Sequence, residues 1–228
     1  MKKLLLFLFS LSLCAEIIIP QTTQQLLLVS SADFNTTRGV LQAYERKGTA
    51  WTKVFEEIPV NLGRSGLAWG KGLRSFSASK NEPHKKEGDG KSPAGLFTLQ
   101  TFFGYNKAHF NFPYLHLSSS TLCIDDSESA HYNQIVQSPT PSQYKSFEYM
   151  RRKDDLYKFG IVVGHNQEGI KKGGSCIFIH IQRGPDASTS GCTSMHEEKL
   201  IQVMQWLDKE QSPLLLQMPK SHLIQGFK

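Results

Sequence analysis

Residues 176–192 read CIFIHIQRGPDASTSGC and join a short apolar segment to a polar loop that ends in a cysteine. The first six residues are rich in β-branched and aromatic side chains, which predicts a strand over residues 176–181 with His180 near its end. The Gly, Pro, Asp, Ser and Thr residues that follow predict a surface loop that folds back toward the strand end. We therefore expect His180 and Cys192 to lie close together.

The segment after Cys192 has the pattern of a helix. Ser194 and Glu197 stand three residues apart, as in a capping box. Apolar residues then recur at helical spacing, at Leu200, Val203, Met204 and Leu207. This pattern predicts a helix from Met195 to Lys209, with Cys192 just ahead of its N-terminus.

These residue types suit acyl transfer through a thioester. A helix N-terminus and an imidazolium would lower the pKa of a thiol below its usual value of about 8.5, which raises the thiolate fraction. Gly191 suits a sharp turn, and we expect the N–H groups of Gly191 and Cys192 to face the same space as the sulfur, where an oxyanion would form. The alternative is a buried, inert cysteine beside a structural histidine.

The pattern resembles the L,D-transpeptidases of bacterial cell-wall assembly, the family with the YkuD-type catalytic domain. That family has a strand histidine, a variable loop and then Ser/Thr-x-Gly-Cys, which here are His180 and Thr189-Ser190-Gly191-Cys192. The similarity covers about residues 55–218. Further blocks that look like the family are Asp89–Phe97, Trp69–Leu73, Cys123–Asp126 and Met150–Asn166.

The resemblance implies a single-domain β-sandwich with accessory helices. It also implies that Cys192, His180 and Gly191 are catalytic and that Ser190 and Thr189 contact the substrate. The family's frequent Arg two residues after the cysteine is Ser194 here, so Arg183 is the candidate for binding a substrate carboxylate, with Arg151 and Arg152 as alternatives. His165 and Asn166 follow a predicted strand and are further candidates to line the pocket; the alternative for His165 is an exposed loop position.

The implied substrate is a peptidoglycan stem peptide. Cys192 would attack the carbonyl that precedes a D-alanine, release that D-alanine and pass the acyl group to an amine of a second stem peptide. An L,D-carboxypeptidase, which uses water as acceptor, and a non-catalytic wall-binding module are the alternative functions. The resemblance further implies that carbapenems acylate Cys192, because they imitate the acylated stem. No cofactor is expected.

Residues 1–15 have the layout of a secretory signal peptide, with Lys2 and Lys3 before an apolar run that ends in Cys14-Ala15. We therefore expect an exported protein of the periplasm or cell envelope, with residues 16–228 as one domain and no stable membrane span. A lipid anchor on Cys14 is the alternative.

The formal net charge of +6 indicates a mild preference for anionic partners. The basic residues are spread along the chain without an aromatic platform, which argues against nucleic-acid binding. His-Glu-x-x-His and Cys-x-x-Cys patterns are absent, so we expect no metal site. The sequence leaves the oligomeric state open.

The strand pattern predicts a mainly β domain, compatible with a sandwich or a partly closed barrel. A second helix is predicted over Ser127–Gln137, and much of Gly63–Gly95 should be loop, either a lid or an exposed connector. Cys123 and Cys176 could form a disulfide or stay as separate thiols, whereas a bond between Cys176 and Cys192 would contradict the mechanism. The predicted strands are 26–30, 39–44, 51–59, 96–102, 121–124, 160–163, 176–181 and 214–218.

Overall fold

A computed structural model describes residues 17–76, 81–223 and 227 of the 228-residue chain. The expected signal peptide, residues 1–15, and Cys14 lie outside the described residues. Among the residues that are described, no helix combines the length and the apolar character that a membrane crossing requires.

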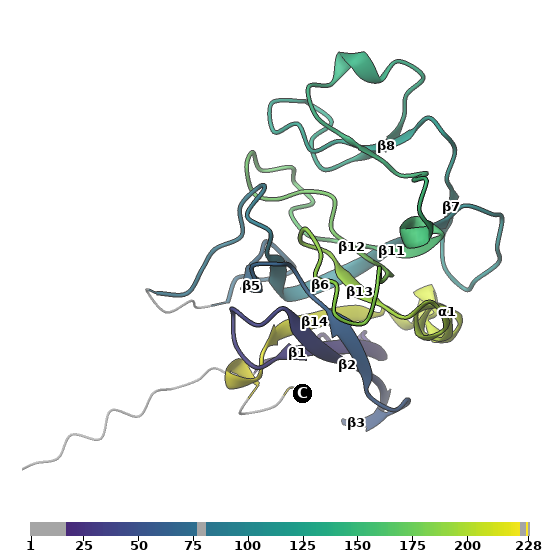
Figure 1. Cartoon of the computed structure of the whole chain (residues 1–228). Helices are drawn as coiled ribbons and strands as arrows, with labels where there is room; N and C mark the ends of the chain where they lie inside the picture. The colour runs from purple at the N-terminus through teal and green to yellow at the C-terminus, as the bar shows by residue number, and fades with distance from the viewer. Residues whose placement is uncertain (1–16, 77–80, 224–226, 228) are drawn as a thin grey trace, which may run out of the picture.

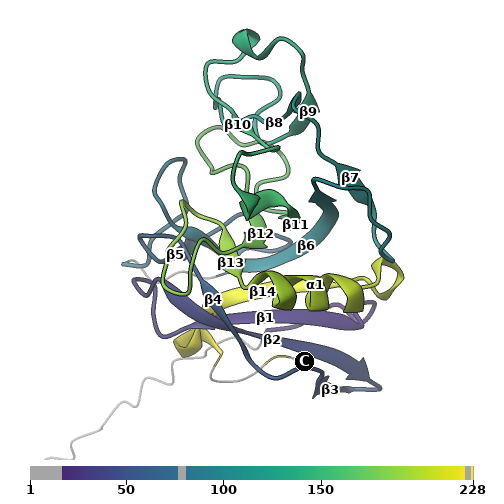
Figure 2. The same ribbon diagram turned by 45° about the vertical axis from the view of Figure 1, so that its right-hand side comes forward.

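One large sheet forms the body of the molecule (Figures 1 and 2). Its strands are β1 (Gln25–Ser31), β2 (Arg38–Lys47), β3 (Ala50–Lys53), β4 (Ile58–Asn61), β5 (Leu67–Trp69), β6 (Ser92–Gly104), β7 (Tyr114–His116), β11 (Phe159–Val163), β12 (Phe178–Ile181), β13 (Thr193–Met195) and β14 (Leu214–Pro219). The order runs β1-β14-β6-β11-β12-β13-β4-β2, and β2 pairs with β1 again. The sheet therefore closes into a barrel-like core, and the mainly β prediction is confirmed.

Most side chains of the strands β1 and β14 are apolar, and they are buried on both faces of this closed sheet. Leu26 to Val29 are buried, and so is the whole of β14. The large side chains of Phe97 and Phe102 on β6 fill the same core. Burying one such side chain contributes about 1.5–3 kcal/mol to folding. This packing makes a rigid frame for β12 and β13, which carry the site.

The one α-helix of the described residues, α1 (Glu197–Trp206), is shorter than predicted. Its apolar stripe of Leu200, Val203 and Met204 is buried, and the helix packs against β11 and β12. The residue before the helix is His196, whose side chain makes no capping hydrogen bond. The predicted capping box is wrong, because Ser194 belongs to β13 and pairs with β12 instead.

A second, three-stranded sheet stands apart from the barrel at the top of Figures 1 and 2. It consists of β10 (Glu148–Tyr149), β8 (Thr121–Cys123) and β9 (Ile135–Gln137). The predicted helix over Ser127–Gln137 is wrong: the segment forms turns and then β9. The short 3₁₀ helices are η1 (Pro141–Gln143), η2 (Asp155–Tyr157), η3 (Lys209–Gln211) and η4 (Lys220–His222).

A disulfide joins this small sheet to the barrel. Cys123 at the end of β8 is bonded to Cys176, two residues ahead of β12, with an S–S distance of 2.07 Å. The predicted strand 176–181 therefore begins only at Phe178, since Cys176 has a left-handed backbone with φ of +54°. Of the cysteines described, Cys192 alone is free. A free thiol at this position is what the expected mechanism requires.

Candidate active site

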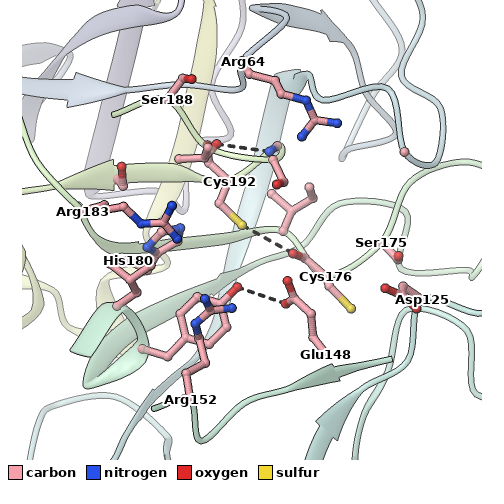
Figure 3. Close-up of a pocket in the computed structure, with 18 of the residues that line it drawn as sticks. Arg64, Asp125, Glu148, Arg152, Ser175, Cys176, His180, Arg183, Ser188 and Cys192 are labelled. Atoms are coloured by element: carbon pink, nitrogen blue, oxygen red, sulfur yellow. Dashed lines mark hydrogen bonds between the residues drawn. The ribbon is translucent and has the colours of Figure 1, made fainter. Parts of the chain in front are cut away.

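A cavity of about 410 Å³ opens between the barrel and the small sheet. His180, Cys192 and the loop residues 187–191 line one side, and Glu148 with the η2 segment lines another. Figure 3 shows the sulfur of Cys192 between the side chain of His180 and the backbone of Cys176. The structure therefore brings together the histidine and the cysteine that the sequence singles out.

His180 is held on β12, between β11 and β13, and is only 7% exposed. Its Nδ1–H donates to the backbone carbonyl of Ile181 at 2.8 Å, which orients the ring. This bond leaves Nε2 as the nitrogen with a free lone pair. Burial lowers the pKa of His180 to about 4, so the ring is neutral at pH 7 and able to accept a proton.

Cys192 is 8% exposed, and its sulfur lies in a backbone cradle. The Phe178 N–H donates to Sγ at 3.3 Å, and the thiol donates to the Cys176 carbonyl at 3.5 Å. Burial, followed by the nearby Glu148 carboxyl, raises the pKa of the Cys192 thiol to about 12. The expectation of a lowered pKa is wrong, because β13 separates Cys192 from the helix start and the imidazole is neutral.

Two hydroxyl groups hold the backbone of the cysteine loop. Thr189 Oγ1 donates to the Cys192 carbonyl at 2.6 Å and accepts from the Gly191 N–H at 3.1 Å. Ser92 Oγ donates to the same carbonyl at 2.9 Å and accepts from the Gly63 N–H. Gly191 has φ of +151°, a conformation that favours glycine. The Gly191 N–H that we expected to face an oxyanion is thus engaged with Thr189.

The sequence model of one protein family, the L,D-transpeptidase catalytic domain (YkuD), matches residues 30–215. This match contains the whole cavity wall from Arg64 to Ser194. The chain belongs to the L,D-transpeptidase catalytic-domain family.

The solved structures that this chain is similar to are distant in sequence. Bd1075 from Bdellovibrio bacteriovorus is 14% identical with a TM-score of 0.43, and the match covers 85% of this chain and 47% of that protein. The helical cell shape determining protein Pgp2 from Campylobacter jejuni is 16% identical with a TM-score of 0.42 and the same coverages. The chain thus spans about half the length of these proteins. No curated protein matches it.

Two residues that we expected in the pocket of this L,D-transpeptidase domain lie elsewhere. His165 is 2% exposed; its Nδ1 accepts from the Lys71 N–H, and its Nε2 meets the Gly173 carbonyl at 3.1 Å. The side-chain amide of Asn166 binds the backbone of Ile170 and Gly174. Both side chains are occupied in folding the loop after β11, and neither lines the Cys192 cavity.

The three arginines considered for binding a substrate carboxylate differ in their position relative to the cavity. Arg183 is exposed and lines the cavity, as does Ser190. Arg152 also lines it but pairs with Asp154 through two contacts of 2.8 Å. Arg151 donates to backbone carbonyls outside the cavity wall. Arg183 therefore remains the best-placed guanidinium of the three for a substrate carboxylate.

Sequence reasoning missed several cavity residues. Glu148 on β10 accepts from the hydroxyl of Tyr157 at 3.0 Å, and the Tyr157 ring packs edge-on against His180. Burial raises the pKa of both Glu148 and Tyr157. Arg64 and Lys85 come from the Gly63–Gly95 segment, which therefore forms a cavity wall. Of these four residues only Tyr157 lies in a block that resembled the family, Met150–Asn166.

No group of three His, Cys, Asp or Glu side chains in the described residues is arranged to hold a metal ion. The cavity wall offers the Cys192 thiol, the His180 imidazole and several hydroxyl groups.

Proposed function

We propose that the protein catalyses cysteine-dependent acyl transfer on peptidoglycan stem peptides, with Cys192 as nucleophile and His180 as base. The observation that carries the proposal is the shared cavity: Cys192 Sγ and a neutral His180 with a free Nε2 line the same wall. Family membership supports the substrate class.

The first half of the reaction forms the thioester. Cys192 Sγ attacks the peptide carbonyl that precedes the terminal D-alanine, and its proton passes from the Cys176 carbonyl contact to His180 Nε2. The C–N bond then breaks, and His180 returns the proton to the leaving amine of D-alanine. The resting pair is neutral, so the thiolate forms only as the attack proceeds.

Charged groups of the cavity fit a stem peptide, which carries carboxylates. Arg183 and Arg64 line the wall and make no ion pair within the described residues. A guanidinium presents a planar fork of donors that suits a carboxylate. We assign Arg183 to substrate binding, with Ser190 at the same rim, and Gly191 and Thr189 to the loop that presents the sulfur.

The second half of the reaction distinguishes a transpeptidase from an L,D-carboxypeptidase. An amine of a second stem peptide gives a cross-link, whereas water gives a shortened peptide. A non-catalytic wall-binding module would use the same cavity without turnover. The rate of Cys192 alkylation does not separate the module from the enzyme, because a buried, neutral thiol should react slowly in both cases. Turnover therefore has to decide between them.

We place the protein outside the cytoplasm. The Cys123–Cys176 disulfide suits an oxidising compartment, and the sequence predicts a signal peptide ahead of the described residues. A periplasmic or envelope location would give the site access to peptidoglycan.

The test is D-alanine release from a disaccharide tetrapeptide by purified protein. Wild-type protein should release D-alanine and produce either cross-linked dimers or tripeptides, which identifies the acceptor. Cys192→Ala should release none, and Cys192→Ser, which keeps the shape of the loop, should lose at least about 10²-fold because the hydroxyl is a weaker nucleophile. D-alanine release by Cys192→Ala at the wild-type rate would refute the proposal.

A further inference from the structure

Ser194 is a buried polar side chain without a partner. It is 1% exposed, and its Oγ makes no hydrogen bond within the described part of the chain. It lines the same cavity as Cys192 and His180. Most buried side-chain polar atoms in proteins have a hydrogen-bond partner, so an unpartnered one calls for an explanation. Ser194 thus contributes an unused hydrogen-bonding group to the wall of the cavity.

The strand register fixes the face of the sheet on which Ser194 stands. Ser194 on β13 is directly paired with His180 on β12 in a parallel ladder, so the two side chains stand on the same face of the sheet. On its other side Ser194 is paired with Asn61 of β4, whose amide already donates to the Gly184 carbonyl at 3.0 Å. The Ser194 side chain thus stands next to the His180 side chain on one face of the sheet.

The spacing suits one small bridging atom. Neighbouring strands lie about 4.8 Å apart, so a single oxygen between them can bond to both side chains. A carboxylate is a poor occupant, because Ser194 is neutral and burial of an unpaired charge is costly. The exposed Arg183 offers a carboxylate a better place. A water molecule is neutral and needs only two to four polar partners.

We propose that the Ser194 hydroxyl holds the water that hydrolyses the acyl-enzyme, next to His180 Nε2. This inference rests on the proposed function. The water oxygen forms a C–O bond with the thioester carbonyl, and one water proton passes to His180 Nε2. The C–S bond breaks, the proton returns to Cys192 Sγ, and the products are a peptide carboxylic acid and the free thiol. Ser194 is a positioning residue: it binds the water but exchanges no proton.

The experiment separates the two halves of the reaction. Wild-type protein and Ser194→Ala are mixed rapidly with disaccharide tetrapeptide, and D-alanine release and acyl-enzyme mass are followed in time. The first turnover of D-alanine release should stay within about twofold, whereas hydrolysis of the acyl-enzyme should slow about tenfold, which raises the fraction of acyl-enzyme at steady state. A merely structural defect would slow both halves.

Thr and Val at position 194 provide the matched pair, because they have the same shape and differ in the hydroxyl. Ser194→Thr should hydrolyse the acyl-enzyme about tenfold faster than Ser194→Val. Thermal melting checks that each variant is folded. If the larger side chains do not fit, Ser194→Ala, which only removes atoms, tests the role of the hydroxyl.

The outcomes are distinct. Equal hydrolysis by wild type and Ser194→Ala, or equal slowing of both halves, overturns the role of Ser194 and leaves the proposed function standing. If wild-type protein forms no acyl-enzyme and releases no D-alanine, the proposed function fails together with this inference.

Discussion

Burial governs the chemistry of the two central side chains. It raises the pKa of the Cys192 thiol to about 12 and lowers the pKa of His180 to about 4. Desolvation disfavours the charged form of each group, so both are neutral in the resting site. The resting site therefore holds a thiol and not a thiolate. In the proposed reaction, the Cys192 proton must pass to His180 once the substrate is bound.

Thr189 offers a test of how the cysteine loop is held. Thr189→Val keeps the shape of the side chain but loses the bonds to the Gly191 N–H and the Cys192 carbonyl. We expect kcat for D-alanine release to fall about tenfold and the free energy of unfolding to fall by about 1 kcal/mol. Thr189→Ser, which keeps the hydroxyl, should stay near wild type. Wild-type kcat in Thr189→Val would show that these bonds do not position the sulfur.

At this scale the sequence predicted that His180 and Cys192 lie close together, because both belong to one contiguous motif. It did not predict Glu148 or Tyr157, which reach the cavity through tertiary contacts that leave no local pattern. The expectation for His165 failed for a related reason: a residue after a strand end can turn inward and satisfy backbone groups.

Among the elements, long apolar runs were predicted best. β14 was expected over 214–218 and spans Leu214–Pro219. The prediction succeeded because a short apolar run of this kind is typical of a buried strand. The predicted helix 127–137 failed because Asp126 and Ser129 accept hydrogen bonds from nearby backbone N–H groups, which favours turns. β13 could not be foreseen, since its three residues are ordered by pairing with β12.

The disulfide should stabilise the small sheet and the site together. It closes a loop with a sequence separation of 53, for which chain entropy alone suggests about 4 kcal/mol. We expect the Cys123→Ser/Cys176→Ser double variant to melt at lower temperature, to lose amide protection in β8 and to release D-alanine more slowly, because Cys176 positions the thiol. Oxidised wild-type protein is the control. Unchanged melting and exchange would show that β8 is held by packing alone.

For the molecule as a whole, the burial of two histidines should lower its stability in acid. His165 and His180 are both buried with a pKa of about 4, below the usual 6.5. Between these values the unfolded chain binds more protons than the folded one, so stability is fully present above about pH 6.5 and declines as the pH falls toward 4. Each histidine should contribute a loss of roughly 3 kcal/mol.

Urea unfolding between pH 4 and pH 7 with the disulfide intact measures this loss. His165→Gln should show a weaker decline than wild type, since glutamine does not take up a proton, and His180→Gln serves as the matched second variant. A decline that is identical in all three proteins would mean that other groups cause it.

The mainly β class of the whole molecule followed from the strand pattern, whereas the closure of the sheet did not. β1 pairs with its neighbour β2 and also with β14, which lies almost 190 residues further along the chain. The second pairing is set by packing and not by local sequence. The barrel-like frame is nevertheless what brings His180 and Cys192 to one cavity and places Ser92 against the Cys192 carbonyl.

The central claim is that Cys192 is the nucleophile, and intact-mass measurement with a carbapenem tests it most directly. Ring opening by the sulfur adds the whole β-lactam, so wild-type protein should gain the mass of one carbapenem, and peptide mapping should place it on Cys192. Cys192→Ala should gain none. An adduct on Cys192→Ala of the same extent, or an unmodified wild-type protein, would contradict the account.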